Sequence, residues 1–333
     1  MLTSNQSLHP FNDFWMNCVS NTVYSIAVSN DSSYRTAAYL NHYTYQVAAD
    51  PAFTYLTMDH PLEYQNEVFN SFIREWEPYI FRNSQEIGEE ICELLDSGQL
   101  PVVHVDLFHW IPNSLAWKQY HWYHYSLITG YDAERSVYRV LDDDINGFRD
   151  FEVPPERLQE AFLSSQTENN PAYQEPPCSL IRLKEEIPPY EFKLSDLSRH
   201  AERLIGELDS LQTEHLWEGT PEADKFEESM TNGLVGVNII ESRQAGNRLM
   251  LRYLFDSGFI KEADFQTLDR ELEELALGWF KAKNVFIKAK FSLKRRFNRE
   301  QLMTLAVPLL YRERNYWSAL LETTGAAALS KES

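Results

Sequence analysis

The stretch HYSLITGYDAERSVYRVLD, residues 124–142, decides the fold that the sequence predicts. Apolar and β-branched residues fill the runs 124–132 and 137–142, and a short turn separates the runs. We expect two adjacent antiparallel strands. Cross-strand neighbours in such a pair have Cβ atoms about 5 Å apart. A carboxylate at the end of the second strand, Asp142, can therefore reach an imidazole at the start of the first strand, His124.

A cysteine lies far upstream of these strands, in the segment FNDFWMNCVSNTVYS. This residue, Cys18, stands at the start of a predicted helix over 17–30. A thiol in the first turn of a helix experiences the positive end of the helix dipole, which favours the thiolate. An imidazole oriented by a carboxylate activates such a nucleophile. We therefore predict a catalytic triad of Cys18, His124 and Asp142.

The chain is expected to have an α+β fold with two domains. The first domain, 1–188, carries the predicted antiparallel sheet and the helix that bears Cys18, and the second, 189–333, is mostly α-helical. Further strands are expected at 101–108 and 178–184, and helices at 85–96 and 154–162. In the second domain, the apolar spacing predicts helices over 195–217, 233–257, 262–292 and 298–322.

Composition excludes several classes of protein. The 333 residues are 43% hydrophobic and 14% aromatic, which suits a folded chain with a large core. The formal net charge of −20 disfavours nucleic-acid binding. Three cysteines without a paired spacing argue against a disulfide framework, and we expect Cys92 to be a core residue and Cys178 a core or surface residue. No signal peptide or apolar run of about 20 residues is visible, so a cytoplasmic location is expected and no membrane partner.

These motifs resemble the papain-like superfamily, and specifically its C39-like and butirosin-biosynthesis-H-type branch. Members of that branch carry a Cys shortly before a helix. They also carry a His followed by apolar residues, Gly-Tyr-Asp, a turn, an apolar strand and an Asp. The matching residues here begin at His124 and include Leu127-Ile128, Gly130-Tyr131-Asp132, Val137–Val140 and Asp142. The strand PVVHVD, the aromatic loop after it and the helical second half are also similar to the family.

The resemblance implies acyl transfer in the biosynthesis of specialised metabolites such as antibiotics. An acyl or aminoacyl group would arrive as a thioester on the phosphopantetheine arm of a carrier protein, pass to Cys18, and then pass to an amine acceptor. No other cofactor is implied. The alternatives are a papain-like cysteine peptidase or amidase, a peptide cyclase, and a non-catalytic binding protein.

Two assignments within the predicted site stay open. Papain-like enzymes place a Gln several residues before the Cys to bind the oxyanion, whereas this chain has Asn12 six residues before the Cys and Asn17 directly before it. Either amide is a candidate donor, together with the backbone N–H of Cys18. The carboxylate that orients the imidazole is Asp142, with Asp143 and Asp144 as alternatives.

Aromatic and basic residues suggest binding surfaces. The loop before the first strand is rich in large rings, which either pack in the core or line a substrate channel. The channel candidates are Trp110, Trp117, Tyr120 and Trp122. Residues 281–300 hold five Lys and three Arg against one Glu, and form either a solvated helix face or a docking patch for an acidic carrier protein. The docking candidates are Lys288, Lys290, Lys294, Arg295 and Arg296.

Two metal motifs are considered and disfavoured. Several possible ligands fall within about 20 residues, namely His104, Asp106, His109, His121 and His124, but their spacing matches no familiar ligand pattern. The run from Asp142 to Gly147 imitates the start of a calcium loop, but Val153 stands where the bidentate Glu should be. The sequence therefore predicts no metal.

Overall fold

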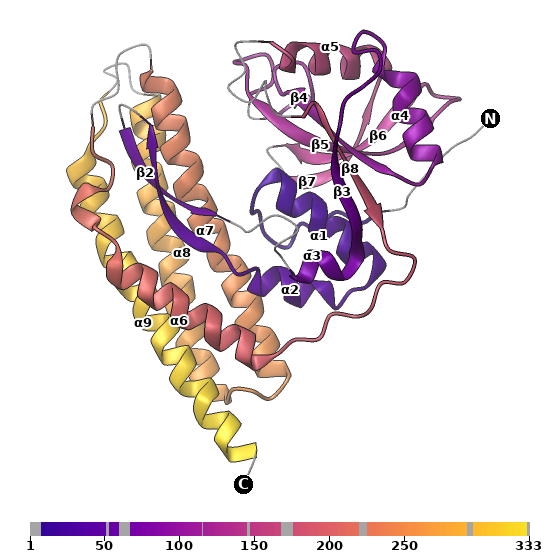
Figure 1. Cartoon of the computed structure of the whole chain (residues 1–333). Coiled ribbons are helices and arrows are strands. Elements are labelled where there is room, and N and C mark those ends of the chain that lie inside the picture. The colour runs from indigo at the N-terminus through magenta and orange to yellow at the C-terminus, as the bar shows by residue number, and fades with distance from the viewer. Residues whose placement is uncertain are drawn as a thin grey trace. The chain divides into compact units, whose positions relative to one another are not determined.

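We describe a computed structural model of the chain over residues 8–50, 53–59, 67–114, 116–144, 147–167, 176–219, 225–291 and 296–331. The chain forms two compact units (Figure 1). Unit 1 comprises Met1–Arg35 and Leu62–Tyr190, and unit 2 comprises Thr36–Pro61 and Glu191–Ser333. The fold is α+β, with antiparallel sheets and a helical C-terminal half, as the sequence predicts.

The sheet of unit 1 is antiparallel throughout its described strand pairs. Its strands, in spatial order, are β3 (Ile73–Tyr79), β8 (Cys178–Leu183), β4 (Leu100–Asp106), β5 (Tyr123–Asp132), β6 (Val137–Asp144) and β7 (Gly147–Val153). The antiparallel strand pair that the sequence predicts within 124–142 is found in this sheet as the neighbouring strands β5 and β6. Residues 145–146, between β6 and β7, lie outside the described residues.

Helices cover this sheet and fix the position of the predicted site. They are α1 (Cys18–Asn30), α3 (Glu67–Phe72), α4 (Ile87–Asp96) and α5 (Pro155–Ser165). Helix α1 packs against β5 and β6, and both α4 and α5 pack against β4. The buried cluster beneath α4 and α5 joins Ile91 and Phe162 to strand residues such as Val105. The nucleophile-bearing helix therefore rests on the two strands that carry His124 and Asp142.

Unit 2 joins a two-stranded hairpin to long helices. The hairpin strands are β1 (Thr44–Asp50) and β2 (Phe53–Asp59), and the helices are α6 (Leu194–Ser210), α7 (Phe226–Asp256), α8 (Glu262–Lys290) and α9 (Arg299–Lys331), with a 3-10 turn at Thr213–His215. The helices contact one another in the pairs α7–α8, α8–α9 and α6–α9. The predicted helix over 195–217 ends earlier than expected, at Ser210. None of the described helices is both long enough and apolar enough to cross a membrane.

The hairpin is where the observed division of the chain differs from the predicted one. The sequence places residues 36–61 in the first domain, whereas these residues belong to unit 2. Strand β2 packs on α7, where Gly236 faces the backbone of Leu56. A Cβ atom at Gly236 would lie 2.3 Å from the Leu56 carbonyl oxygen, so the close approach requires glycine. Helix α2 (Tyr34–Leu40) spans the division between the units.

Candidate active site

Cys18 occupies the first position of α1, as the sequence predicts. The preceding residue, Asn17, is the N-cap, and its Oδ1 accepts a 2.7 Å hydrogen bond from the Ser20 backbone N–H. The first turn of a helix leaves its backbone N–H groups without intrahelical partners, so Cys18 stands at the positive end of the helix dipole of α1. The thiol is partly exposed and forms no disulfide.

A buried amide holds the segment that leads to Cys18. The side chain of Asn21 donates to the carbonyls of Phe11 and Phe14, at 3.0 and 3.1 Å. Its Oδ1 accepts from the Met16 backbone N–H at 2.9 Å. Asn21 is fully buried, and this support was not predicted because the three contacts depend on how the preceding segment folds back over α1.

His124 and Asp142 meet across β5 and β6. The Nε2–H of His124 donates to Oδ2 of Asp142 at 3.2 Å. Their side chains are only 9% and 1% exposed, so water hardly screens the interaction. The strand register pairs Leu127 with Leu141, which brings Asp142 to the same end of the strand pair as His124. Because Nε2 is hydrogen-bonded to the carboxylate, Nδ1 is the ring nitrogen that remains to exchange a proton with the thiol.

The Asp142 carboxylate is held by further donors. Its Oδ2 accepts a 2.7 Å hydrogen bond from Nε1 of Trp110, and its Oδ1 accepts a 2.8 Å bond from the Asp143 backbone N–H. The same indole N–H lies 3.1 Å from Oγ of Ser126. These contacts fix the carboxylate, and through it the orientation of the His124 imidazole.

The electrostatics of the pair favour opposite charges on its members. Burial raises the pKa of the Asp142 carboxyl, but the neighbouring His124 outweighs burial and holds that pKa below its usual value. Burial also lowers the pKa of His124, but Asp142 and a hydrogen bond with Cys18 outweigh it, so the pKa of His124 lies well above its usual range. The imidazole therefore interacts with both predicted partners, and the three residues are brought together.

The two alternative carboxylates lie differently. Burial, and then the adjacent Asp142 charge, raise the pKa of Asp143 to about 7. Asp144 forms an ion pair with Arg149 on the neighbouring strand. Hydrogen bonding to the imidazole thus favours Asp142 over either neighbour.

The two oxyanion candidates each accept a hydrogen bond from a backbone N–H at the side-chain oxygen. Asn17 caps α1 through its Oδ1, which leaves its NH₂ group as the end that could donate. Asn12 is exposed, and its Oδ1 accepts a 3.2 Å hydrogen bond from the Phe148 backbone N–H, which leaves its NH₂ group as the end that a substrate oxygen would meet. Gly147 lies against this amide with φ +113°, and a Cβ atom there would be 2.6 Å from the Asn12 Oδ1. Both amides therefore keep a donor for an oxyanion, and Gly147 makes room for that of Asn12.

The aromatic candidates do not form one group. Trp110 is fully buried and bonded to Asp142, so its prediction as a channel wall is wrong: the indole needs a partner for its N–H and finds one in the core. Trp117 lies beside cations, with Lys118 and Arg157 placed 5.0 and 5.4 Å from its ring. Tyr120 and Trp122 are partly buried and pack against the core cluster of unit 1. Trp117, Tyr120 and Trp122 remain candidates for substrate contact.

The basic docking candidates belong to unit 2, and the two other cysteines belong to unit 1. Lys288 and Arg296 line a hollow of about 390 Å³ together with Asn298 and Gln301. Lys290 instead donates to Oγ1 of Thr231 at 2.8 Å, which removes it from any docking surface. Lys294 and Arg295 lie outside the described residues. Cys178 is buried, whereas Cys92 is partly exposed and lies 3.9 Å from the Tyr138 hydroxyl.

Two groups of metal-ligand residues occur in the described chain. One consists of the catalytic candidates His124 and Asp142 with Asp143. The other joins Asp106, His109 and His121, three of the five residues whose metal role the sequence disfavours. His104 belongs to neither group. It is buried, and burial lowers its pKa to about 4.

Comparison with known proteins adds no relative to this picture. No protein-family model matches the chain, and no curated protein matches it.

Proposed function

We propose that the protein is a papain-like cysteine acyltransferase that works through Cys18, His124 and Asp142. The observation that carries this proposal is the buried His124–Asp142 pair, whose imidazole interacts with Cys18, the residue at the first position of a helix. Nucleophile, base and orienting carboxylate are the parts that nucleophilic acyl transfer requires.

In the first step, the Cys18 thiolate attacks the carbonyl carbon of an acyl thioester. A bond forms between sulfur and carbon, and the carbonyl oxygen becomes an oxyanion, stabilised by the Cys18 backbone N–H and the Asn12 amide. The oxyanion collapses, the donor's carbon–sulfur bond breaks, and the His124 imidazolium gives its proton to the leaving thiol. Asp142 keeps the imidazole in place and stabilises its positive charge.

In the second step, an amine attacks the acyl-cysteine. His124, now neutral, takes the proton from the amine, and the Cys18 thiolate leaves as the amide forms. Water in place of the amine would give hydrolysis, so a transferase must exclude it. The acyl donor is proposed to be carried on the phosphopantetheine arm of a carrier protein, as in the family that the sequence resembles.

The basic hollow in unit 2 supports an acidic partner. Lys288 and Arg296 offer two cations within one hollow, on a chain whose formal charge is −20. A carrier protein with an acidic surface and a phosphate on its arm matches these cations. Charge reversal, Lys288→Glu with Arg296→Glu, is expected to raise the KM for a carrier-bound donor and leave the KM for a free thioester unchanged.

Intact-protein mass spectrometry tests the proposed chemistry. The enzyme is mixed with an acyl N-acetylcysteamine thioester, with Cys18→Ala as the control. An acyl adduct that the variant lacks, and that amines discharge faster than water, is the expected result. Discharge mainly by water would favour a peptidase or amidase, and discharge by an internal amine would favour a cyclase. If neither free thioesters nor carrier-bound donors give an adduct, a binding protein is favoured.

A further inference from the structure

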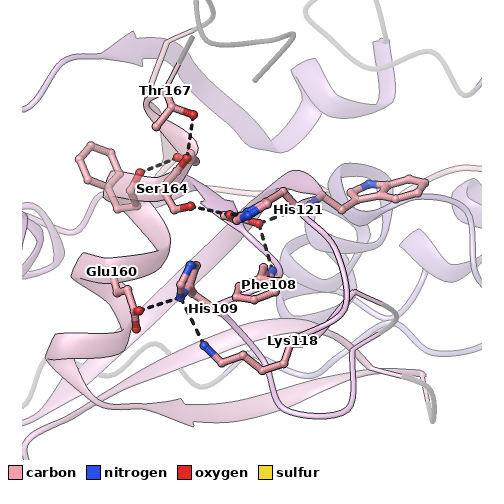
Figure 2. A network of polar contacts seen from close by, with 11 residues as sticks. Phe108, His109, Lys118, His121, Glu160, Ser164 and Thr167 are labelled. Carbon is pink, nitrogen blue, oxygen red and sulfur yellow. Dashed lines mark hydrogen bonds and ion pairs between the residues drawn. The ribbon is translucent and has the colours of Figure 1, made fainter. Parts of the chain in front are cut away.

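The second ligand cluster lies on the loop between β4 and β5. Asp106 ends β4, His109 follows three residues later, and His121 stands just before β5. One ligand atom from each of the three lies within 4.8 Å of the others. Figure 2 shows Glu160 of α5 approaching the same group from the side of His109. None of these residues takes part in the proposed acyl transfer.

Each imidazole of the cluster already faces a carboxylate oxygen through Nδ1. The distance from His121 Nδ1 to Asp106 Oδ2 is 2.5 Å, and that from His109 Nδ1 to Glu160 Oε1 is 2.8 Å. Two imidazole nitrogens and one carboxylate oxygen therefore lie within 4.8 Å of one another, and the Glu160 carboxylate adjoins them at His109 (Figure 2). Nitrogen and oxygen donors of this kind form the usual ligand set of zinc and related divalent cations.

The Asp106 carboxylate is held firmly in place. Its Oδ1 accepts from the backbone N–H groups of Phe108 and Trp122, at 3.0 and 3.3 Å. Its Oδ2 accepts from Oγ of Ser164 at 2.6 Å. Outer contacts of this type orient a ligand before the metal arrives.

A cation already approaches the cluster. Nζ of Lys118 lies 3.4 Å from Nδ1 of His109. This lysine is exposed, so its ammonium can move aside when a divalent ion competes for the His109 nitrogen. The Asp106 side chain is fully buried while that of His121 is 54% exposed, so an ion can reach the buried carboxylate from solvent past the imidazole.

We propose that Asp106, His109 and His121, with Glu160 as a fourth ligand, form a zinc-binding site. In a tetrahedral zinc site the donor atoms are about 3.3 Å apart. Since the three ligand atoms lie within 4.8 Å of one another, adjustments of about 1.5 Å or less create the site. The ion would replace the protons that the imidazoles share with the carboxylates. Bound there, it would join the two ends of the β4–β5 loop to α5. This proposal is independent of the proposed acyl transfer.

Titration with zinc and cobalt(II) tests this site on the full chain. Zinc binding is measured by calorimetry, and cobalt(II) binding by visible absorption, in a Cys18→Ala background that removes the catalytic thiol. One ion per chain is expected, with an absorption spectrum typical of tetrahedral nitrogen and oxygen ligands. Because loss of an outer-shell contact alone costs 10–100-fold in affinity, His109→Ala and His121→Ala should each cost at least about 100-fold.

Two further variants separate this site from nonspecific binding. Lys118→Ala is expected to tighten zinc binding several-fold, because it removes a competing charge. His215→Ala is the matched control, since His215 forms a similar exposed pair with Glu218, at 3.1 Å, outside the cluster. This control should leave the affinity unchanged.

Three results would overturn the zinc site. They are the absence of saturable binding, binding that survives both cluster substitutions, and binding that is lost when His124 is replaced. Circular dichroism of each metal-free variant, with His121→Gln as a milder substitution, shows whether a lost affinity reflects a lost ligand or a lost fold.

Discussion

Each unit of this protein buries a carboxylate, and the two carboxylates behave in opposite ways. Asp142 in unit 1 is bonded to His124, and its pKa is held below the usual value. Glu313 in unit 2 accepts a 3.0 Å hydrogen bond from Gln244 and forms no ion pair within the described residues. Burial raises the pKa of Glu313 to about 7.

The difference shows that the partner of a buried acid decides its charge. Burial disfavours the ionised form in both units. In unit 1 an imidazole offsets this cost, and an adjacent indole and a backbone N–H add hydrogen bonds. In unit 2 the hydrogen-bond partners of Glu313 are neutral donors, and these donors together with the charge of Arg243 do not outweigh burial. The first site keeps a charge that chemistry can use, and the second tends to lose its charge.

Removing the charge of Asp142 should have the largest effect. Asp142→Asn keeps the shape of the side chain but no longer favours a positive imidazole, so kcat is expected to fall by about 10²–10⁴-fold. Steady-state kinetics with an acyl thioester and an amine measure the loss. The titration midpoint of His124, followed by NMR, should also move to lower pH, because Asp142 raises the pKa of His124. An unchanged midpoint would contradict the pairing.

The capacity of unit 1 to stabilise negative charge should extend to the oxyanion. Asn12→Ala is expected to lower kcat by about 10²–10³-fold if its amide meets the oxyanion. Asn17→Ala is the matched control: it should cost about 1 kcal/mol of stability as a lost helix cap, yet leave kcat close to the wild-type value. Kinetics that rank the two variants in the reverse order would assign the oxyanion to Asn17.

Glu313 gives unit 2 a pH dependence that Asp142 does not give unit 1. Its folded-state pKa of about 7 exceeds the ordinary value of 4.5, so the folded state keeps a proton that the unfolded chain has lost. The stabilising contribution is therefore full below about pH 4.5 and is lost as the pH rises toward 7, by roughly 3 kcal/mol in all. Glu313→Gln should flatten this dependence and stabilise the protein at pH 8. Denaturant unfolding at several pH values measures it, and parallel profiles for the two proteins would refute the assignment.

A smaller effect is expected at the hydrogen bond behind Asp142. Trp110→Phe removes a donor from a buried carboxylate and should lower the free energy of unfolding by roughly 2 kcal/mol. In an Asp142→Asn background the same change should cost less, because the acceptor is then uncharged. Equal costs in both backgrounds, measured by denaturant unfolding, would show that the indole stabilises by packing alone.

Local features of the sequence were sufficient to predict the centre of unit 1. The strands β5 and β6 follow from the alternation and turn within 124–142, and the register then brings His124 and Asp142 together. The helix that begins at Cys18 follows from its apolar spacing. These predictions succeed because each depends on contacts close in sequence or on a single strand pair.

Other features depend on distant contacts and could not be predicted. The hairpin of β1 and β2 belongs to unit 2 because β2 packs on α7, where Gly236 permits the close approach, and β1 contacts α6. Two contacts near Cys18 likewise depend on how distant segments fold together. They are the hydrogen bonds from Asn21 to the segment before Cys18 and the space that Gly147 leaves for Asn12. The ligand cluster of the β4–β5 loop matches no familiar sequence spacing, and the Glu160 carboxylate beside His109 comes from the distant α5.

Site-resolved alkylation tests the central claim most directly, because the chain carries its own controls. Cys92 is partly exposed like Cys18, but burial raises its pKa, and Cys178 is buried with a raised pKa. Iodoacetamide, followed by peptide mass spectrometry, should label Cys18 far faster than the other two near pH 7, and His124→Ala should slow that labelling. If Cys18 reacts no faster than Cys92, or its rate is unaffected by the loss of His124, Cys18 is not an activated nucleophile.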